Sequence, residues 1–235
     1  MKLLVNTQGK ALVAGGNALA VDRGPGYVTD GLIHWLDGID KGASDGSWVD
    51  LIGGHIYTNY GGVTPISNGF YFDGVDDRFY NDTFTTVTKP TTNTIEVVLS
   101  GAQLEDVASC LFAAYAANGS YNVKRLYVAL VRDTSLISLA TTSNYPLYPF
   151  SSASDVKSIV SCPDGRCYVN GVLGESPSSL YCGYNGRGNR IGAGYWNTNR
   201  HFYKGNIHAV RIYDRSLTAE ELAHNYALDL MRFNL

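Results

Sequence analysis

The sequence predicts an all-β protein, a sandwich of two antiparallel sheets with a short C-terminal helix. Its 235 residues include 26 glycines and 17 tyrosines, and charged residues make up 17%, below the roughly 25% of an average globular chain. Glycine permits turns with positive φ, and tyrosine suits a half-buried pleated surface. Strand patterns recur from residue 32 onward, and one helical pattern stands out, at the C-terminus. The composition therefore indicates many short strands joined by tight turns.

Each strand is predicted from a short apolar or alternating run. In residues 207–213 the alternation places Ile207 and Arg211 on one face, and Val210 and Ile212 on the other. An Asn-Gly pair at residues 170–171 predicts a hairpin turn. Strands and helices do not alternate along the chain, which argues against a parallel α/β fold. The predicted strands are Leu32–Leu36, Gly69–Phe72, Thr94–Leu99, Ser109–Ala114, Arg125–Val131, Val156–Val160, Cys167–Val169, Arg190–Ala193 and Ile207–Tyr213.

The helix is predicted from a capping box at Thr218-Ala219-Glu220-Glu221. In such a box the threonine hydroxyl accepts from the Glu221 amide, and the Glu221 carboxylate reaches back to the first residue. We expect this helix to fold back over one edge of the sandwich. Just before it, Arg211 and Asp214 are expected to pair with each other or to cap the path into the helix.

Residues 1–30 are predicted to form a strand-rich appendage, and residues 31–235 the main domain. Lys2–Val5, Ala11–Ala14 and Ala18–Val21 are each a candidate strand, and the segment ends in a Gly-Pro-Gly turn at residues 24–26. Two interpretations are open. The appendage is either an attachment or oligomerisation element, or an extra layer on the same core.

Four passages, in order along residues 31–226, resemble the laminin-G-like (concanavalin A-like) jelly-roll domains of phage and bacterial surface proteins. They are the opening strand 31–37, the aromatic and Asp-Gly-Val-Asp-Asp run 70–77, the hairpin 167–173, and the closing strand and helix start 205–221. The resemblance implies a jelly roll that acts as a non-catalytic binding or structural module. It also implies a phage virion component, such as a head or tail decoration or a fibre, that binds surface glycans.

The acidic residues of the second passage have two interpretations. Asp73, Asp76 and Asp77 suit turn chemistry, because aspartate bonds nearby backbone amides. They also suit a Ca²⁺ site, because clustered hard oxygen ligands favour that ion. Ca²⁺ is the one cofactor that the sequence suggests.

Catalysis is not expected. A retaining glycosidase of this architecture needs carboxylates about 5 Å apart, for example at alternate positions of one strand, and Glu96 stands alone in its predicted strand. The chain contains no nucleophile elbow, zinc-protease motif or phosphate loop.

Aromatic residues mixed with amides and arginine mark the candidate ligand site. Rings cover the C–H face of a sugar, while amide and guanidinium groups bind its hydroxyls. The alternative is that these residues plug the ends of the sandwich or pack against another subunit. The candidates, in a proline-bounded loop at 144–150 and in two later segments, are Tyr145, Tyr148, Tyr184, Asn185, Tyr195, Trp196, Asn197 and Arg200.

The net charge and the cysteines limit which partners and which cellular compartment are compatible with the sequence. The net charge of −3 and the absence of a basic run argue against nucleic acid, and no apolar stretch reaches the roughly 20 residues of a membrane span. The apolar start stops too soon for a signal peptide. Cys162 and Cys167 either form a disulfide or are free buried thiols.

Two functions follow as hypotheses. One is a virion or fibre protein, made in the host cytoplasm, whose partners are other virion proteins or further copies of itself. The other is a stand-alone, lectin-like carbohydrate-binding domain at the bacterial surface or outside the cell.

Overall fold

The computed structural model describes most of the chain in segments. They are residues 4–5, 11–12, 26–41, 46–82, 93–104, 108–115, 126–131, 136–140, 147–149, 152–162, 166–174, 188–196 and 198–235.

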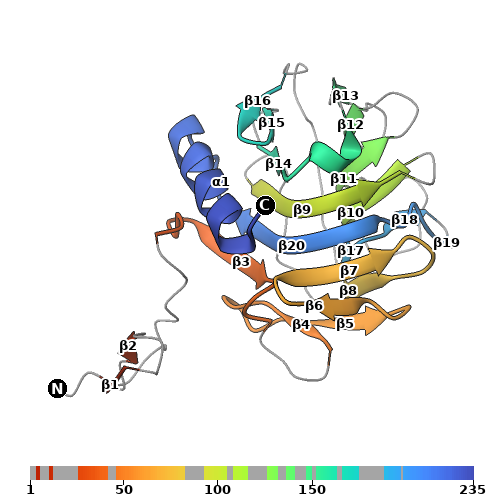
Figure 1. The fold of residues 1–235 in the computed structure, drawn as a ribbon, viewed down its shortest axis with the longest axis horizontal. Coiled ribbons are helices and arrows are strands. Elements are labelled where there is room, and N and C mark those ends of the chain that lie inside the picture. The colour runs from red at the N-terminus through yellow and green to blue at the C-terminus, as the bar shows by residue number, and fades with distance from the viewer. Residues whose placement is uncertain are drawn as a thin grey trace.

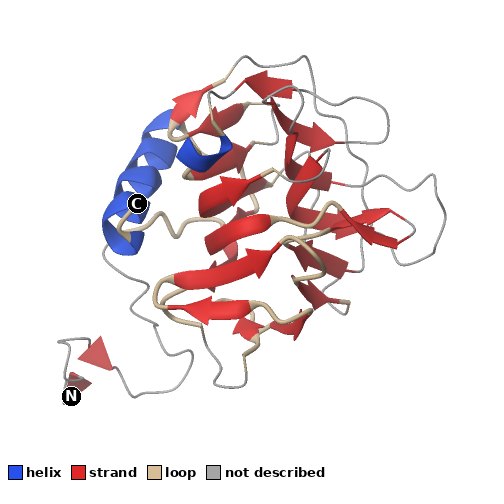
Figure 2. Cartoon of the chain, turned by 45° about the vertical axis from the view of Figure 1, so that its right-hand side comes forward, coloured by secondary structure: helices blue, strands red, loops and turns tan. Residues whose placement is uncertain are grey.

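Two antiparallel sheets face each other and form a sandwich (Figures 1 and 2). The helix-side sheet has the order β16-β15-β14-β9-β20-β7-β6, with β3 also paired to β20. Its strands are β3 (Leu32–Asp37), β6 (Thr64–Ile66), β7 (Gly69–Asp73), β9 (Thr94–Gln103), β14 (Ser158–Ser161), β15 (Cys167–Val169), β16 (Val172–Leu173) and β20 (Lys204–Tyr213).

The opposite sheet has the order β13-β12-β11-β10-β17-β8-β5-β4. Its strands are β4 (Trp48–Val49), β5 (Ile56–Tyr60), β8 (Arg78–Asn81), β10 (Ala108–Tyr115), β11 (Leu126–Val131), β12 (Leu136–Ala140), β13 (Leu147–Pro149) and β17 (Gly188–Ile191). The predicted all-β sandwich is confirmed, and each predicted strand from residue 32 onward overlaps an observed one. The sequence did not predict β5 and β8, whose outward residues form a candidate site below.

An aromatic core fills the space between the sheets. The rings of Trp48 and Phe70 lie 4.8 Å apart, and those of Phe70 and Phe79 lie 4.7 Å apart in an edge-to-face arrangement. All three side chains are fully buried. Burial of each such side chain contributes about 1.5–3 kcal/mol, so the facing rings hold the two sheets together.

Strand β20 runs through the middle of the helix-side sheet, and a bulge corrects one prediction about it. Its register against β9 shifts between Ile207 and Ala209. Simple alternation placed Ile207 opposite to Val210 and Ile212, whereas all three lie in the core between the sheets. The extra residue of a bulge changes which side chains share a face.

The C-terminal helix α1 (Ala219–Phe233) begins as predicted. The Thr218 hydroxyl accepts from the Glu221 amide at 3.2 Å, and the Glu221 carboxylate accepts from the Thr218 amide at 2.8 Å. The helix lies across the middle strands β9 and β20, as Figure 1 shows, rather than over an edge. The reason is a set of buried polar partners on those two strands.

Arg211 is the centre of that buried network, which corrects its expected pairing with Asp214. Its guanidinium donates to Glu96 of β9 at 2.7 Å and to Asp229 of α1 at 2.8 Å. Asn225 of the same helix donates to Glu96 at 3.1 Å, whereas Asp214 is exposed. A helix that supplies a carboxylate to a buried arginine is fixed in position, because a shift of the helix would leave the buried guanidinium without one of its partners.

At the N-terminus, β1 (Leu4–Val5) and β2 (Ala11–Leu12) form a separate two-stranded sheet, while the candidate strand Ala18–Val21 lies outside the described residues. Tyr27 packs on Trp35 and donates to Asp229 at 2.7 Å. The end of the predicted appendage thus contacts the main domain. Whether residues 1–30 attach or oligomerise the protein stays a prediction.

The smaller elements complete the description. The Asn170-Gly171 turn joins β15 to β16 as predicted, with positive φ at both residues. A single 3₁₀ turn, η1 (Ala153–Asp155), precedes β14, and β18 (Gly194–Trp196) pairs with β19 (Thr198–Arg200). Among the described residues, no helix has the length and apolar character to cross a membrane.

Candidate functional sites

Half of the predicted ligand-binding residues lie outside the described residues, namely Tyr145, Tyr184, Asn185 and Asn197. The other four are placed by their backbone, Tyr148 in β13, Tyr195 and Trp196 in β18, and Arg200 in β19. Residues 147–149 form an edge strand where the sequence suggested a loop. Three strands separate β13 from β17, which leads into β18, a distance of roughly 19 Å at 4.8 Å per strand. The described candidates therefore lie in two separate groups, one in β13 and one in β18 and β19.

The outer face of the opposite sheet carries aromatic residues that the sequence analysis missed. On β8, Phe79 points into the core, so its neighbours Arg78 and Tyr80 point outward. Tyr57 of β5 also lies in the core, which places Tyr60 on the outer face. The alternation of inward and outward residues in 56–60 and 78–81 could have predicted these two strands, but both runs are short and polar.

Each outward tyrosine lies beside an arginine on the neighbouring strand. Tyr60 pairs with Arg78 in the register of β5 and β8, and Tyr80 pairs with Arg190 in that of β8 and β17. The Arg78 guanidinium carbon is 3.6 Å from the Tyr60 ring centroid, and that of Arg190 is 5.0 Å from the Tyr80 centroid. Such cation–π contacts contribute about 0.5–2 kcal/mol each and fix the rings.

The exposed parts of this face are Tyr60 and the polar neighbours of the partly buried Tyr80. Tyr60 is 50% exposed, whereas Arg78 and Arg190 are each 8% exposed. Asp82 accepts from Arg190 at 2.6 Å and keeps 55% of its side chain exposed. Thr58, beside Tyr80, is also exposed. The arginines thus support the rings, while a ring, a hydroxyl and a carboxylate are accessible at the surface. We call Thr58, Tyr60, Tyr80 and Asp82 the tyrosine face.

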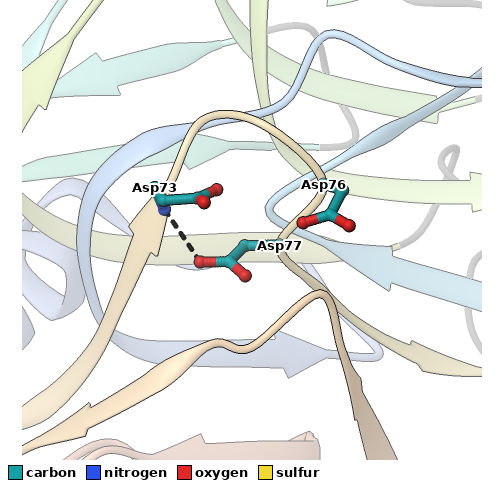
Figure 3. A group of neighbouring side chains, drawn as sticks. All are labelled: Asp73, Asp76 and Asp77. Atoms are coloured by element: carbon teal, nitrogen blue, oxygen red, sulfur yellow. Dashed lines mark hydrogen bonds between the residues drawn. The ribbon is translucent and has the colours of Figure 1, made fainter.

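A second candidate site is the acidic loop, residues 73–77, which joins β7 to β8 (Figure 3). The structure brings Asp73, Asp76 and Asp77 together, with one carboxylate oxygen of each within 4.8 Å of the others. The Asp73 amide donates to Asp77 Oδ2 at 2.9 Å, and the Val75 amide donates to Asp73 Oδ1 at 2.8 Å. The predicted turn chemistry is therefore present, and the three carboxylates also offer a set of hard oxygen ligands.

The interior of this loop holds an unusual carboxylate. Asp77 is 3% exposed, and its Oδ1 has no hydrogen-bond partner among the described residues. Burial raises the pKa of Asp77, and the nearby negative charges of Asp73 and Asp76 raise it further, against the lowering effect of the Asp73 amide. A negative charge at Asp77 is therefore costly unless a cation accompanies it.

Glu96, the lone carboxylate of its predicted strand, has a structural environment. It is fully buried under α1 and bonded to Arg211 and Asn225. Burial raises its pKa, and the Arg211 guanidinium opposes that shift. These contacts identify Glu96 as one of the buried partners that hold α1 against the sheet.

The cysteines that the structure describes, Cys110, Cys162 and Cys167, are buried and reduced. Cys162 and Cys167 therefore do not form the disulfide that was one of the two interpretations. Burial raises the pKa of the Cys167 thiol, which keeps it protonated and unreactive.

A family model described as the concanavalin A-like lectin/glucanases superfamily matches residues 150–223, about a third of the chain. These residues include the hairpin β15–β16 and the closing strand β20 of the helix-side sheet, β17 of the opposite sheet and the start of α1. This chain has the concanavalin A-like fold. The resemblance to laminin-G-like jelly rolls is thereby confirmed, and so is the predicted fold class.

Solved structures of the same fold support this assignment. The sialidase of Trypanosoma rangeli in complex with sialic acid aligns with a TM-score of 0.64 at 17% identity, covering 86% of this chain and 33% of the sialidase. Domain 4 of AbnA, an extracellular arabinanase of Geobacillus stearothermophilus, in complex with arabinotriose, aligns with a TM-score of 0.59 at 14% identity, covering 82% of this chain and 97% of that domain.

The receptor-binding domain of botulinum neurotoxin of the C/D mosaic serotype aligns with a TM-score of 0.57 at 14% identity, covering 86% of this chain and 52% of that chain. This concanavalin A-like chain spans only about a third of the length of the sialidases that it matches. At these identities the likeness establishes the fold alone. A comparison with curated protein sequences finds no match.

Proposed function

We propose that this concanavalin A-like domain is a non-catalytic carbohydrate-binding module, and that sugar binds at the tyrosine face. The observation that carries the proposal is the half-exposed Tyr60 ring, held against Arg78 at 3.6 Å on the outer face of the opposite sheet. The carbohydrate-bound structures among its structural neighbours, the sialidase with sialic acid and the arabinanase domain with arabinotriose, are consistent with this role.

The ring supplies the apolar part of the site. A sugar ring presents a C–H face that stacks on an aromatic side chain. Arg78 restricts the motion of the Tyr60 ring before any ligand arrives. Binding then loses less side-chain entropy, because about 0.5–1.5 kcal/mol is required to immobilise a mobile side chain.

The polar part of the site lies around Tyr80. Thr58 is its partner in the register of β5 and β8, and Arg190 is its partner on β17. Asp82, held by Arg190 at 2.6 Å, keeps more than half of its carboxylate side chain exposed. A carboxylate and a hydroxyl accept hydrogen bonds from sugar hydroxyls, and the charge-assisted bond to Asp82 is the stronger of the two.

The other outer face is less suitable for a ligand. On the helix-side sheet, α1 covers the middle strands, where Val98 and Ala209 pack on Phe233 and Arg211 bonds Asp229. A ligand would have to displace that helix. The tyrosine face requires no such rearrangement of the described elements.

The test is a glycan microarray followed by calorimetry with the best sugar. We expect Tyr60→Ala to weaken binding about tenfold, which corresponds to about 1.4 kcal/mol and to the loss of one stacked ring. The matched control is Tyr71→Ala, a half-buried tyrosine on β7 of the other sheet, and it should bind as the unaltered protein does. An array without binding, or equal affinity of both variants, would contradict the proposal.

A structural role in a virion is a second proposal, supported by the separate sheet of β1 and β2. We expect the full chain to oligomerise through residues 1–23 and a chain that begins at Gly24 to be monomeric. The truncation keeps Tyr27, which bonds Asp229 of the main domain. Size-exclusion chromatography with light scattering measures the mass of both chains. If the full chain is also a monomer, the assembly role is contradicted.

A further inference from the structure

We propose that the acidic loop binds one divalent cation, Ca²⁺, through Asp73, Asp76 and Asp77. This site is distinct from the tyrosine face, and its test does not depend on any sugar. The loop joins β7 to β8 at the rim of the sandwich, and Figure 3 shows the three carboxylates gathered inside its curve.

The separation of the oxygen atoms fits the size of Ca²⁺. One carboxylate oxygen from each aspartate lies within 4.8 Å of the others. Two ligands on opposite sides of one Ca²⁺, each about 2.4 Å from the ion, are about 4.8 Å apart, and three evenly spaced ligands are about 4.2 Å apart. The three oxygens are therefore near enough to meet at one Ca²⁺ after small side-chain movements. Mg²⁺ demands a stricter octahedral geometry and gives up its water less readily.

Asp77 provides the independent evidence for a ligand. One of its oxygens, Oδ2, is fixed by the Asp73 amide at 2.9 Å. The other, Oδ1, is buried without a hydrogen-bond partner among the residues that the structure describes. Leaving a buried polar atom unpaired is destabilising, and more so for a charged group. A cation coordinated at Oδ1 removes that cost.

The loop that precedes β6 lies against the acidic loop. Chain neighbours aside, a Cβ atom added to Gly62 would have one neighbour within 4 Å among the described residues, Asp77 Oδ1 at 3.8 Å. A Cβ on the adjacent Gly61 would lie 2.6 Å from the Asp76 backbone. The absence of a side chain at Gly61 therefore lets this loop lie close to Asp76.

Two cationic residues lie near the loop. Arg78 donates to the backbone carbonyl of Asp76 at 3.0 Å and stacks on Tyr60, so it stabilises the path of the loop. Lys204 of β20 is the partner of Asp73 in the register of β7 and β20, and its side chain lies beside Gly74. A divalent cation at the centre of the three carboxylates would offset their mutual repulsion.

Calorimetry on the full chain, stripped with a chelator and titrated with CaCl₂, tests the proposal. We expect one site per chain, weaker binding of MgCl₂, and a higher melting temperature with CaCl₂ than with chelator. Asp77→Asn should weaken Ca²⁺ binding at least tenfold, because it removes the charge of the central ligand. The matched control is Asp155→Asn, an exposed aspartate in η1, which should bind Ca²⁺ like the unaltered chain.

A second variant keeps the test decisive if Asp77→Asn does not fold. Asp76 is exposed, so Asp76→Asn should leave the fold intact and still weaken Ca²⁺ binding. The proposal would be overturned if CaCl₂ gave no binding heat and no change in melting temperature. It would also be overturned if Asp76→Asn bound Ca²⁺ with unchanged affinity.

Discussion

The two outer faces of the sandwich use arginine and tyrosine in opposite ways. On the helix-side sheet, Arg211 stacks on Tyr27 at 4.6 Å and is 1% exposed beneath α1. On the opposite sheet, Arg78 stacks on Tyr60, whose ring is half exposed. The same pair of residue types is therefore enclosed on one face and presented on the other.

The difference lies in which groups balance the charge of each arginine. Arg211 bonds Glu96 and Asp229, so its charge is balanced inside the protein. Arg78 donates to a backbone carbonyl and otherwise contacts a ring. A buried arginine with two carboxylate partners fixes the architecture, whereas we propose that the arginines behind Tyr60 and Tyr80 prepare a surface for a ligand.

Replacing Arg211 with alanine should cause the largest loss of stability. The substitution leaves Glu96 and Asp229 buried without their cation, which costs about 3–5 kcal/mol. Arg190→Ala on the other face removes an ion pair with the exposed Asp82, worth about 1 kcal/mol or less, and a cation–π contact with Tyr80, worth about 0.5–2 kcal/mol, so we expect a smaller loss. Urea unfolding measures both. Equal losses for the two variants would remove the contrast between the faces.

His34, buried between the two sheets, should make the stability of the protein sensitive to acid. Burial is the main cause that lowers its pKa from 6.5 to about 4, so the unfolded chain binds a proton before the folded one does. The free energy of unfolding should therefore fall as the pH drops from about 6.5 to about 4, by about 3 kcal/mol in total. This contribution is fully present above pH 6.5.

Denaturant unfolding of the unaltered chain and of His34→Gln at pH 7 and pH 4.5 checks that expectation. The variant should lose less stability on acidification, while it retains the contribution of His208, whose pKa burial also lowers. Parallel losses in the two proteins would show that His34 titrates at its ordinary pKa.

Weakening the helix cap should have a smaller effect, confined to the helix-side face. Thr218→Ala removes the hydroxyl that accepts from the Glu221 amide, at a cost of about 1 kcal/mol. Hydrogen exchange should show faster exchange in α1 and unchanged protection in β5 and β8. Faster exchange in all these elements would mean that the cap supports the whole sandwich.

Tyr60→Ala should have the smallest effect on stability. Half of the ring is already exposed, so we expect a loss of less than about 1 kcal/mol, together with the tenfold loss of sugar affinity given above. Thermal unfolding of the variant separates the two effects. A large drop in stability would assign Tyr60 to the architecture and not to a ligand.

The sequence predicted the architecture well because its strands repeat and its helix begins with a local capping box. Thr218 and Glu221 are three residues apart, so their contact is visible in the sequence. Arg211 was misassigned, because its partners Glu96 and Asp229 are brought near only by the fold.

The candidate sites show the same limit. The acidic loop was found because Asp73, Asp76 and Asp77 are neighbours in the sequence. The tyrosine face was missed because Tyr60 and Arg78 belong to different short strands, and only their register brings them together. The aromatic loops that were predicted to bind a ligand lie largely outside the described residues.

An NMR titration of the labelled protein with the best sugar from the microarray tests most directly whether sugar binds at the tyrosine face. We expect amide shifts to change in β5, β8 and β17, around Tyr60 and Tyr80, and to stay constant in β9, β20 and α1. Shift changes centred on α1 or β20, with β5 and β8 unaffected, would contradict it.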